Sequence, residues 1–293
     1  MYSFVVAKVI KKNMKSKTSI AKRVYHLNLV PEHISKDIFL VGDQGRVSEI
    51  SKRFDRIEHQ IANREFITHT GYIGKKRISV ISTGIGTDNI DIVINELDAL
   101  VNTDLQTGRK LKSLTKLNLV RLGTSGTIHK EINLNSIVVS SYGMGLDNLM
   151  HFYANNDFDQ EIQEAINNQL KWPTQLSKPY IYAANQDLLN KFDGFISGIT
   201  VTAPGFYAPQ GRKIRIPYAF KNLNQEMINF NFKGIKITNY EMETSALYGL
   251  GKLMGHNCLT LCTILANRAT NKRSKNYKSA IENLINQALD KLV

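Results

Sequence analysis

The sequence predicts a single α/β domain in which helices cover both faces of a largely parallel or mixed β-sheet. Three observations support this fold class. Short apolar runs with β-strand composition alternate along the chain with amphipathic helical patterns. Glycines directly follow several of these runs, as in strand–turn–helix units. The chain has 293 residues, 42% of them apolar, which is sufficient for one sizeable core.

Residues 1–24 are expected to form a basic extension, and residues 25–293 the domain itself. The extension carries Lys8, Lys11, Lys12, Lys15, Lys17, Lys22 and Arg23. The sequence contains no internal repeat, low-complexity tract or linker-like segment that would divide the domain further. We therefore predict one domain after the extension.

The first half of the domain contains three apolar runs that each lead into glycines. The runs and the segments that follow them are Ile38–Val41 before Gly42–Arg46, Ile78–Ser82 before Thr83–Gly86, and Leu117–Leu122 before Gly123–Gly126. Helical patterns begin at Val47 and, after Gly86, continue through Ile90 to Leu100. We expect three strands, each followed by a turn.

The second half continues the alternation. Strands are expected at Ser136–Ser140, Gly198–Thr202 and Cys258–Leu265, and helices within Asn155–Pro179, over Thr244–Leu253 and from about Ser279. Cys258 and Cys262 are four residues apart in an apolar strand, so we expect buried, reduced cysteines on one face.

The charge balance restricts the possible partners. The chain has 38 basic and 25 acidic residues, a net charge of +13. Much of the excess lies in the extension and in a second cluster, Lys272–Lys278, and no nucleic-acid-binding motif accompanies it, so we expect no nucleic-acid partner. No apolar run is long enough to span a membrane, and the chain start is unlike a signal peptide. We expect a cytoplasmic protein that does not interact with membranes.

The glycine turns predict an anion site at the carboxyl edge of the sheet. Exposed backbone N–H groups there would be joined by Arg46, Arg121 and the hydroxyl of Thr124. Arginine binds phosphate oxygens in pairs, so this set suits phosphate. No Walker loop or dinucleotide fingerprint is present. The alternative is that each glycine serves turn geometry alone.

The segment Asn239–Glu243 places Met242 between Glu241 and Glu243, just before a helical run. Carboxylates accept hydrogen bonds from hydroxyl groups, while a thioether packs against an apolar ring face. This combination suits a sugar, although acidic residues also occur at ordinary helix starts.

Six motifs in order resemble the nucleoside phosphorylases of the trimeric and hexameric class, with the nearest likeness to uridine phosphorylase. They are Val41–Arg46, Asn63–Phe66, Ser82–Gly86, Arg121–Gly126, Phe206–Arg212 and Asn239–Glu243. The resemblance extends from about Tyr25 to the last helix. It implies a single-domain, distorted barrel-like mixed sheet flanked by helices, as in the phosphorylase/hydrolase fold.

The resemblance also implies roles for individual residues. The phosphate site would comprise Gly42, Arg46, Arg121 and Thr124, together with Arg64 from a neighbouring subunit. The ribose would meet Met242, Glu243 and Glu241, and also His26 of a partner. The base would lie against Phe206, Gln210, Arg212, Ile264 and Leu265. Arg121, Glu243 and Arg212 would be the catalytic residues. Sharing of sites implies a homo-oligomer, at least a dimer and in the family a hexamer.

The implied reaction is phosphorolysis of a pyrimidine nucleoside in salvage, most simply uridine and phosphate to uracil and ribose 1-phosphate. Phosphate is then a co-substrate, and we expect neither a metal nor another cofactor. Purine-specific relatives have an aspartate after the strand that ends near Ala266, whereas Asn267-Arg268 stands here. The alternatives are a purine nucleoside phosphorylase, a nucleosidase, which would need no arginine cluster, and a non-catalytic nucleoside sensor.

Overall fold

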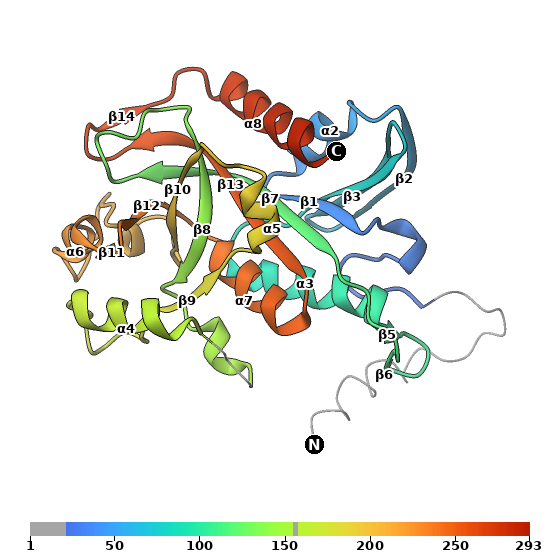
Figure 1. Cartoon of the computed structure of the whole chain (residues 1–293), viewed down its shortest axis with the longest axis horizontal. Coiled ribbons are helices and arrows are strands. Elements are labelled where there is room, and N and C mark those ends of the chain that lie inside the picture. Colours follow the sequence, from blue (N-terminus) through green and yellow to red (C-terminus); the bar gives the residue numbers. More distant parts are fainter. Residues whose placement is uncertain (1–21, 155–157) are drawn as a thin grey trace.

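The computed structural model describes residues 22–154 and 158–293. Most of the expected basic extension and the start of the Asn155–Pro179 stretch therefore lie outside the described residues. A 12-stranded mixed sheet forms the centre of the domain, and helices pack on both of its faces (Figure 1). None of the helices in the described ranges is long and apolar enough to cross a membrane.

Five strands of this sheet close into a barrel. In spatial order they are β12 (Ile235–Glu241), β10 (Ile196–Thr202), β8 (Ile137–Gly145), β13 (Asn257–Asn267) and β7 (Asn118–Thr127). The ring closes where β12 pairs antiparallel with β7, through Asn239 with Thr127 and Tyr240 with Gly126. The expected barrel-like mixed sheet is confirmed.

The sheet continues beyond β7 as an open extension. Its strands are β1 (Asp37–Val41), β4 (Lys76–Ser82), β3 (Phe66–Ile73) and β2 (Arg56–Asn63). β1 lies parallel between β7 and β4, and both of its faces are covered, which explains its continuous apolar sequence. The β2–β3 hairpin was not predicted, because its exposed strand β2 is mostly polar and lacks a clear apolar alternation.

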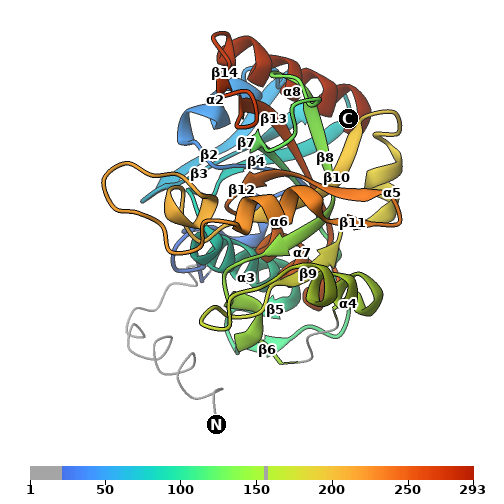
Figure 2. The ribbon, with the colours of Figure 1, turned by 90° about the vertical axis from the view of Figure 1, so that its left-hand side faces the viewer.

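Alternate residues of β1 point to two different cores. Phe39 and Val41 pack with α2 (Gln44–Ser51) and α8 (Tyr277–Leu292), whereas Ile38 and Leu40 pack toward α3 (Thr87–Asn102) and α7 (Thr244–Met254). The view in Figure 2 shows α8 and α3 on opposite sides of the strands. The remaining elements are η1 (Pro31–His33), β5 (Thr103–Asp104), β6 (Arg109–Lys110), η2 (Leu149–Phe152), α4 (Gln160–Gln169), β9 (Tyr180–Ala183), α5 (Gln186–Asn190), η3 (Ala208–Gln210), α6 (Leu223–Asn229), β11 (Asn231–Phe232) and β14 (Lys272–Arg273).

One expected turn is wrong. Gly123–Gly126 does not follow a strand but lies inside β7, which continues to Thr127 because this segment pairs with β13 and then with β12. The first two glycine turns are confirmed and lie side by side, since the Thr83 amide donates to the Val41 carbonyl at 2.8 Å. Cys258 and Cys262 are buried free thiols, as expected.

Candidate active site

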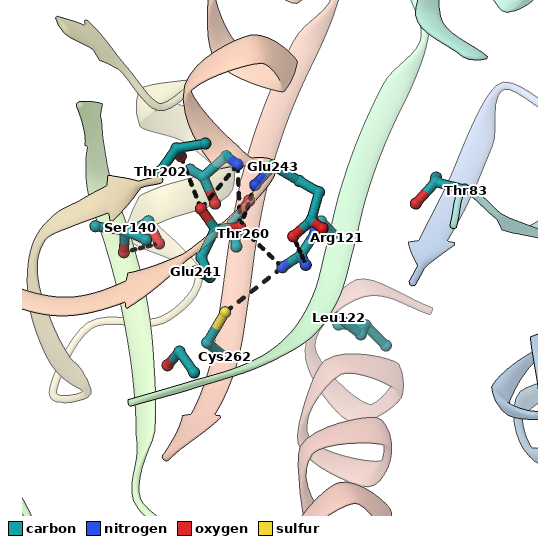
Figure 3. Close-up of polar contacts among 12 residues, drawn as sticks. Thr83, Arg121, Leu122, Ser140, Thr202, Glu241, Glu243, Thr260 and Cys262 are labelled. Carbon is teal, nitrogen blue, oxygen red and sulfur yellow. Dashed lines mark hydrogen bonds and ion pairs between the residues drawn. The ribbon is translucent and has the colours of Figure 1, made fainter. Parts of the chain in front are cut away.

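Arg121 is buried at the centre of a cluster of charged side chains. It stands on β7, between β1 and β13, and only 4% of its surface is exposed. One guanidinium nitrogen, Nη2, donates to Glu243, and the other, Nη1, lies 3.2 Å from the Glu241 carboxylate (Figure 3). The antiparallel pairing of β12 with β7 explains this meeting, because it directs the residues after Tyr240 back along β7 toward Arg121.

Glycine at position 123 makes room for the arginine. A Cβ atom at this position would lie 2.0 Å from Nη1 of Arg121 and 3.0 Å from Sγ of Cys262. The Sγ atom of Cys262 is 3.6 Å from the same Nη1. This contact is one of the dashed lines in Figure 3. Any side chain at position 123 would therefore displace the guanidinium group.

The two carboxylates of the cluster have different surroundings. Glu241 accepts hydrogen bonds from the amides of Glu243 and Thr244 at the start of α7 and from Thr202 Oγ1 at 2.7 Å. Its oxygens are thus fully engaged by the protein, and we interpret Glu241 as a support for the helix start and for Arg121. Glu243 accepts hydrogen bonds from Arg121 and from the Gly86 amide at 2.9 Å, and it stands directly before α7, next to the half-buried Met242.

Burial governs the electrostatics of this cluster. It raises the pKa of Glu243 to about 7, with Arg121 acting in the opposite direction and Glu241 adding to the rise. Burial acts to lower the pKa of Arg121, but Glu243 and Glu241 outweigh it and keep that pKa above its usual value. Arg121 therefore stays charged, and Glu243 is the group of the pair whose protonation changes near neutral pH.

Arg46 brings a second cation to the same strand. It lies on α2, is 8% exposed, and donates to the Leu122 carbonyl of β7 at 3.0 Å. Burial lowers the pKa of Arg46, and the like charge of Arg121 lowers it further, so the two guanidinium groups interact. The turn that contains Gly42 leads directly into α2, whose first turn is capped by Asp43. Thr124 lies half-buried in β7, three residues beyond Arg121.

A second group of arginines gathers at the other end of β7. Arg212 and Arg268 both donate a hydrogen bond to the side-chain oxygen of Gln210. Both also lie beside Gly126 of β7, since a Cβ atom at this position would be 3.6 Å from Nη2 of Arg212 and 3.5 Å from Nε of Arg268. The guanidinium carbon of Arg212 also lies 3.9 Å from the ring centre of Phe206, a residue that is 51% exposed. Three of the expected base-binding residues are therefore brought together, with an additional arginine that sequence reasoning missed.

The sequence-based case against a purine substrate rested on Asn267, but the side chain that faces Gln210 belongs to the next residue, Arg268. Asn267 donates to the carbonyls of His129 and Ile132, both at 2.9 Å, so its side chain anchors a loop and does not face Gln210. Arg268 faces Gln210 instead. The feature of the sequence that could have identified it is its position directly after a buried strand. Burial and Arg212 lower the pKa of Arg268 to about 10.

Ile264 and Leu265, the two residues expected to form the apolar wall of the base site, differ in their burial. Ile264 is fully buried and packs with Ile132 and Val138, and its assignment to the base site stays a prediction. Leu265, next to it on the strand, retains exposed surface, because neighbouring residues of a strand face opposite sides.

His26 and Arg64 form a separate surface cluster with Tyr25. Arg64 is at the tip of the β2–β3 hairpin with φ 54°, and its guanidinium group lies 5.4 Å from the Tyr25 ring centre. The neighbouring Asn63 donates to the His26 carbonyl at 2.7 Å. In the described part of the chain, neither His26 nor Arg64 makes a hydrogen bond or ion pair with Arg46 or Arg121.

Comparison with known proteins agrees with this geometry. Residues 36–292 match the model of the phosphorylase superfamily. A uridine phosphorylase of Thermococcus kodakarensis is 26% identical, over 86% of this chain and 80% of its own. A DeoD-type purine nucleoside phosphorylase of Buchnera aphidicola is 23% identical, over 92% of this chain and 98% of its own.

Among solved structures, a nucleoside phosphorylase of Trypanosoma brucei, described as showing uridine phosphorylase activity, superposes with a TM-score of 0.83. It is 26% identical and covers 92% of this chain and 97% of its own. The match to the family model spans nearly the whole domain, and the expectation of a pentosyltransferase of the nucleoside phosphorylase type is confirmed. The chain belongs to the phosphorylase superfamily.

Proposed function

We propose that this chain catalyses the phosphorolysis of uridine, in which uridine and phosphate give uracil and ribose 1-phosphate. The observation that carries the proposal is the placement of two buried arginines on neighbouring residues of β7: Arg46 donates to the carbonyl of Leu122, and the adjacent Arg121 pairs with Glu243, the residue before α7. A nucleosidase has no need of two desolvated cations, since its nucleophile is water. Inorganic phosphate is the co-substrate, and no metal or other cofactor takes part.

Phosphate finds donors that the protein leaves available. Nε of Arg121 is buried without a hydrogen-bond partner among the described residues. Arg46 uses Nη1 for a single carbonyl. These guanidinium groups would neutralise and aim the dianion, together with Thr124 and the Gly42 turn, and positioning of this kind supplies much of the rate acceleration. Glu243, near a sugar hydroxyl, would accept a hydrogen bond that strengthens as the ribose becomes cationic.

The reaction itself is a substitution at C1′ of the ribose. A phosphate oxygen forms the new bond to C1′, the bond from C1′ to the base nitrogen breaks, and its electron pair leaves with the uracil. Arg212 and Arg268 would stabilise the negative charge that spreads onto the uracil oxygens. Solvent then protonates the base. Two cations that share the neutral Gln210 favour an anionic leaving group, which supports a pyrimidine over a purine that leaves protonated.

We further propose a homo-oligomer with shared active sites. His26 and Arg64 are neighbours on one surface and are separate from the Arg46–Arg121 cluster, as expected of residues donated to a second copy. The smallest competent unit would be a dimer, and the family arrangement would be a hexamer. The reaction would serve nucleoside salvage.

The experiment is absorbance turnover of uridine, thymidine, inosine and adenosine, each with and without phosphate. We expect uridine to be cleaved in the presence of phosphate or arsenate, and inosine and adenosine to be poor substrates. Equal rates without phosphate would establish a nucleosidase and overturn the proposal. Preference for inosine would keep phosphorolysis but refute the pyrimidine assignment.

A further inference from the structure

The side chain of Asn224 connects two elements beside the Arg212–Arg268 group. Asn224 lies in the first turn of α6, and its side-chain oxygen accepts a hydrogen bond from the hydroxyl of Tyr240 at 3.0 Å. Its amide nitrogen donates to the backbone carbonyl of Gln210 at 3.4 Å. One small side chain therefore contacts both β12, which carries Tyr240, and η3, which ends at Gln210.

The chemistry of these two partners determines the orientation of the Asn224 amide. Burial raises the pKa of Tyr240, so its hydroxyl keeps the proton and donates it. The Gln210 carbonyl can only accept, so the nitrogen of the Asn224 amide must face it. Gly211 permits this approach, because it has φ 67° and a Cβ atom there would lie 2.2 Å from the Asn224 nitrogen. Both ends of the amide are thus engaged.

Arg268 is held by the same two residues that Asn224 contacts. Its guanidinium carbon lies 4.6 Å from the centre of the Tyr240 ring, and Tyr240 is 1% exposed. Nη1 of Arg268 donates to the Gln210 carbonyl, and Nη2 donates to the Gln210 side-chain oxygen at 2.6 Å. The ring supports the face of the guanidinium group, while Gln210 binds its edge. The orientation of Arg268 therefore depends on two partners that share Asn224.

The charge of Arg268 makes such a support important. Its partners are neutral, namely an aromatic ring, a backbone carbonyl and an amide oxygen, and no carboxylate of the described residues pairs with it. Burial and the like charge of Arg212 disfavour its cation, as its lowered pKa indicates. Nε of Arg268 is buried and has no hydrogen-bond partner among the described residues. A donor therefore remains for an anionic ligand.

We propose that Asn224 and Tyr240 are positioning residues that hold Arg268 in the orientation that stabilises the departing uracil anion. The inference rests on the proposed function and adds to it a support that lies behind the base-binding residues. A fixed donor stabilises developing charge best, because it does not have to reorient during the reaction. A loosened Arg268 should slow the cleavage of uridine more than that of 5-fluorouridine, because fluorine withdraws electrons and makes the base a better leaving group.

The test compares uridine with 5-fluorouridine in the presence of phosphate. Tyr240→Phe removes only the hydroxyl that reaches Asn224, and Asn224→Ala removes the amide. Each variant should lower kcat/KM about tenfold for uridine and about threefold for 5-fluorouridine, while KM for phosphate stays unchanged. Tyr153→Phe is the matched control, because it also removes a phenol hydroxyl that donates to a side chain, that of Asp91 on α3. It should leave the ratio of the two substrates unchanged.

Double variants show whether Asn224 and Tyr240 act through Arg268. When Arg268→Ala is already present, adding Tyr240→Phe or Asn224→Ala should cause no further loss with either substrate. Tyr240→Phe combined with Asn224→Ala should likewise behave as Asn224→Ala alone, because the two residues form one chain of contacts. Melting temperature and oligomer mass are measured for each protein, so that a loss caused by unfolding is recognised.

The outcomes separate the inference from the function on which it rests. Equal losses with the two substrates, additive losses in the double variants or a raised KM for phosphate would refute the inference and leave phosphorolysis intact. Failure of the unaltered protein to cleave either nucleoside with phosphate would refute the proposed function, and the inference with it. If Asn224→Ala is unstable, Tyr240→Phe decides the matter, because it deletes a single oxygen atom and keeps the ring that contacts Arg268.

Discussion

The two ends of β7 handle positive charge in opposite ways. At the phosphate end, Arg121 is buried against two carboxylates, so the cluster is nearly balanced before any ligand binds. At the base end, Arg212 and Arg268 share the oxygen of a neutral amide, and no carboxylate of the described residues pairs with either. The comparison indicates that the proposed phosphate end is part of the folded core, whereas the proposed base end leaves positive charge uncompensated, which would suit the anionic product of the proposed reaction.

Removing Arg121 should have the largest effect. Arg121→Ala leaves Glu241 and Glu243 buried without a cation, so we expect a loss of about 3–5 kcal/mol in the free energy of unfolding. Phosphate-dependent turnover should fall below detection. Chemical denaturation and steady-state kinetics measure the two quantities. A stable but inactive variant would contradict the view that this end of the strand is part of the core.

Removing Arg268 should affect catalysis more than stability. Arg268→Ala relieves the repulsion from Arg212, so the free energy of unfolding should change by less than about 1 kcal/mol, while kcat should fall about 10- to 100-fold. KM for phosphate should be unchanged. The companion variant Arg212→Ala should behave alike. A rise in the phosphate KM as large as the fall in kcat would show that the two ends are not separate.

The smallest effect concerns pH. The raised pKa of Glu243 means that the folded protein binds more protons than the unfolded chain between about pH 4.5 and about pH 7. The contribution of Glu243 to stability is therefore fully present below the lower value and is lost as pH rises to the higher one. Glu243→Gln should flatten this dependence in denaturation experiments at a series of pH values. If the slope of the free energy of unfolding against pH were unchanged, the pH dependence would arise from other groups.

Sequence patterns predicted the surroundings of Arg46 and Arg121 better than those of Arg212. Arg46, Arg121 and the two glycine turns lie where parallel strands end or run side by side, and local sequence determines such positions well. The course of Gly123–Gly126 could not be predicted, because β7 continues only through pairing with β13 and β12, which are distant in sequence. Arg268 was missed for a related reason: a single-residue difference in strand phase decides which side chain faces Gln210.

The β2–β3 hairpin and the contact between Glu96 of α3 and His26 could not be predicted from the sequence either. β2 is largely exposed and polar, so its strand is formed by pairing with β3 and carries no apolar period. Glu96 reaches His26 across 70 residues of chain, and a helical glutamate gives no sign of such a contact. Both features depend on tertiary structure.

The central claim, that Arg46 and Arg121 bind inorganic phosphate, is tested most directly by calorimetric titration of phosphate into the protein. Arg46→Ala should weaken phosphate binding at least tenfold, since it removes one charge-assisted contact. The control is Arg53→Ala, which removes an arginine just after the same helix that pairs with Glu282 on the surface. We predict the same phosphate affinity in the unaltered protein and in Arg53→Ala, and an affinity at least tenfold lower in Arg46→Ala. Equal affinity in all three proteins would contradict the account.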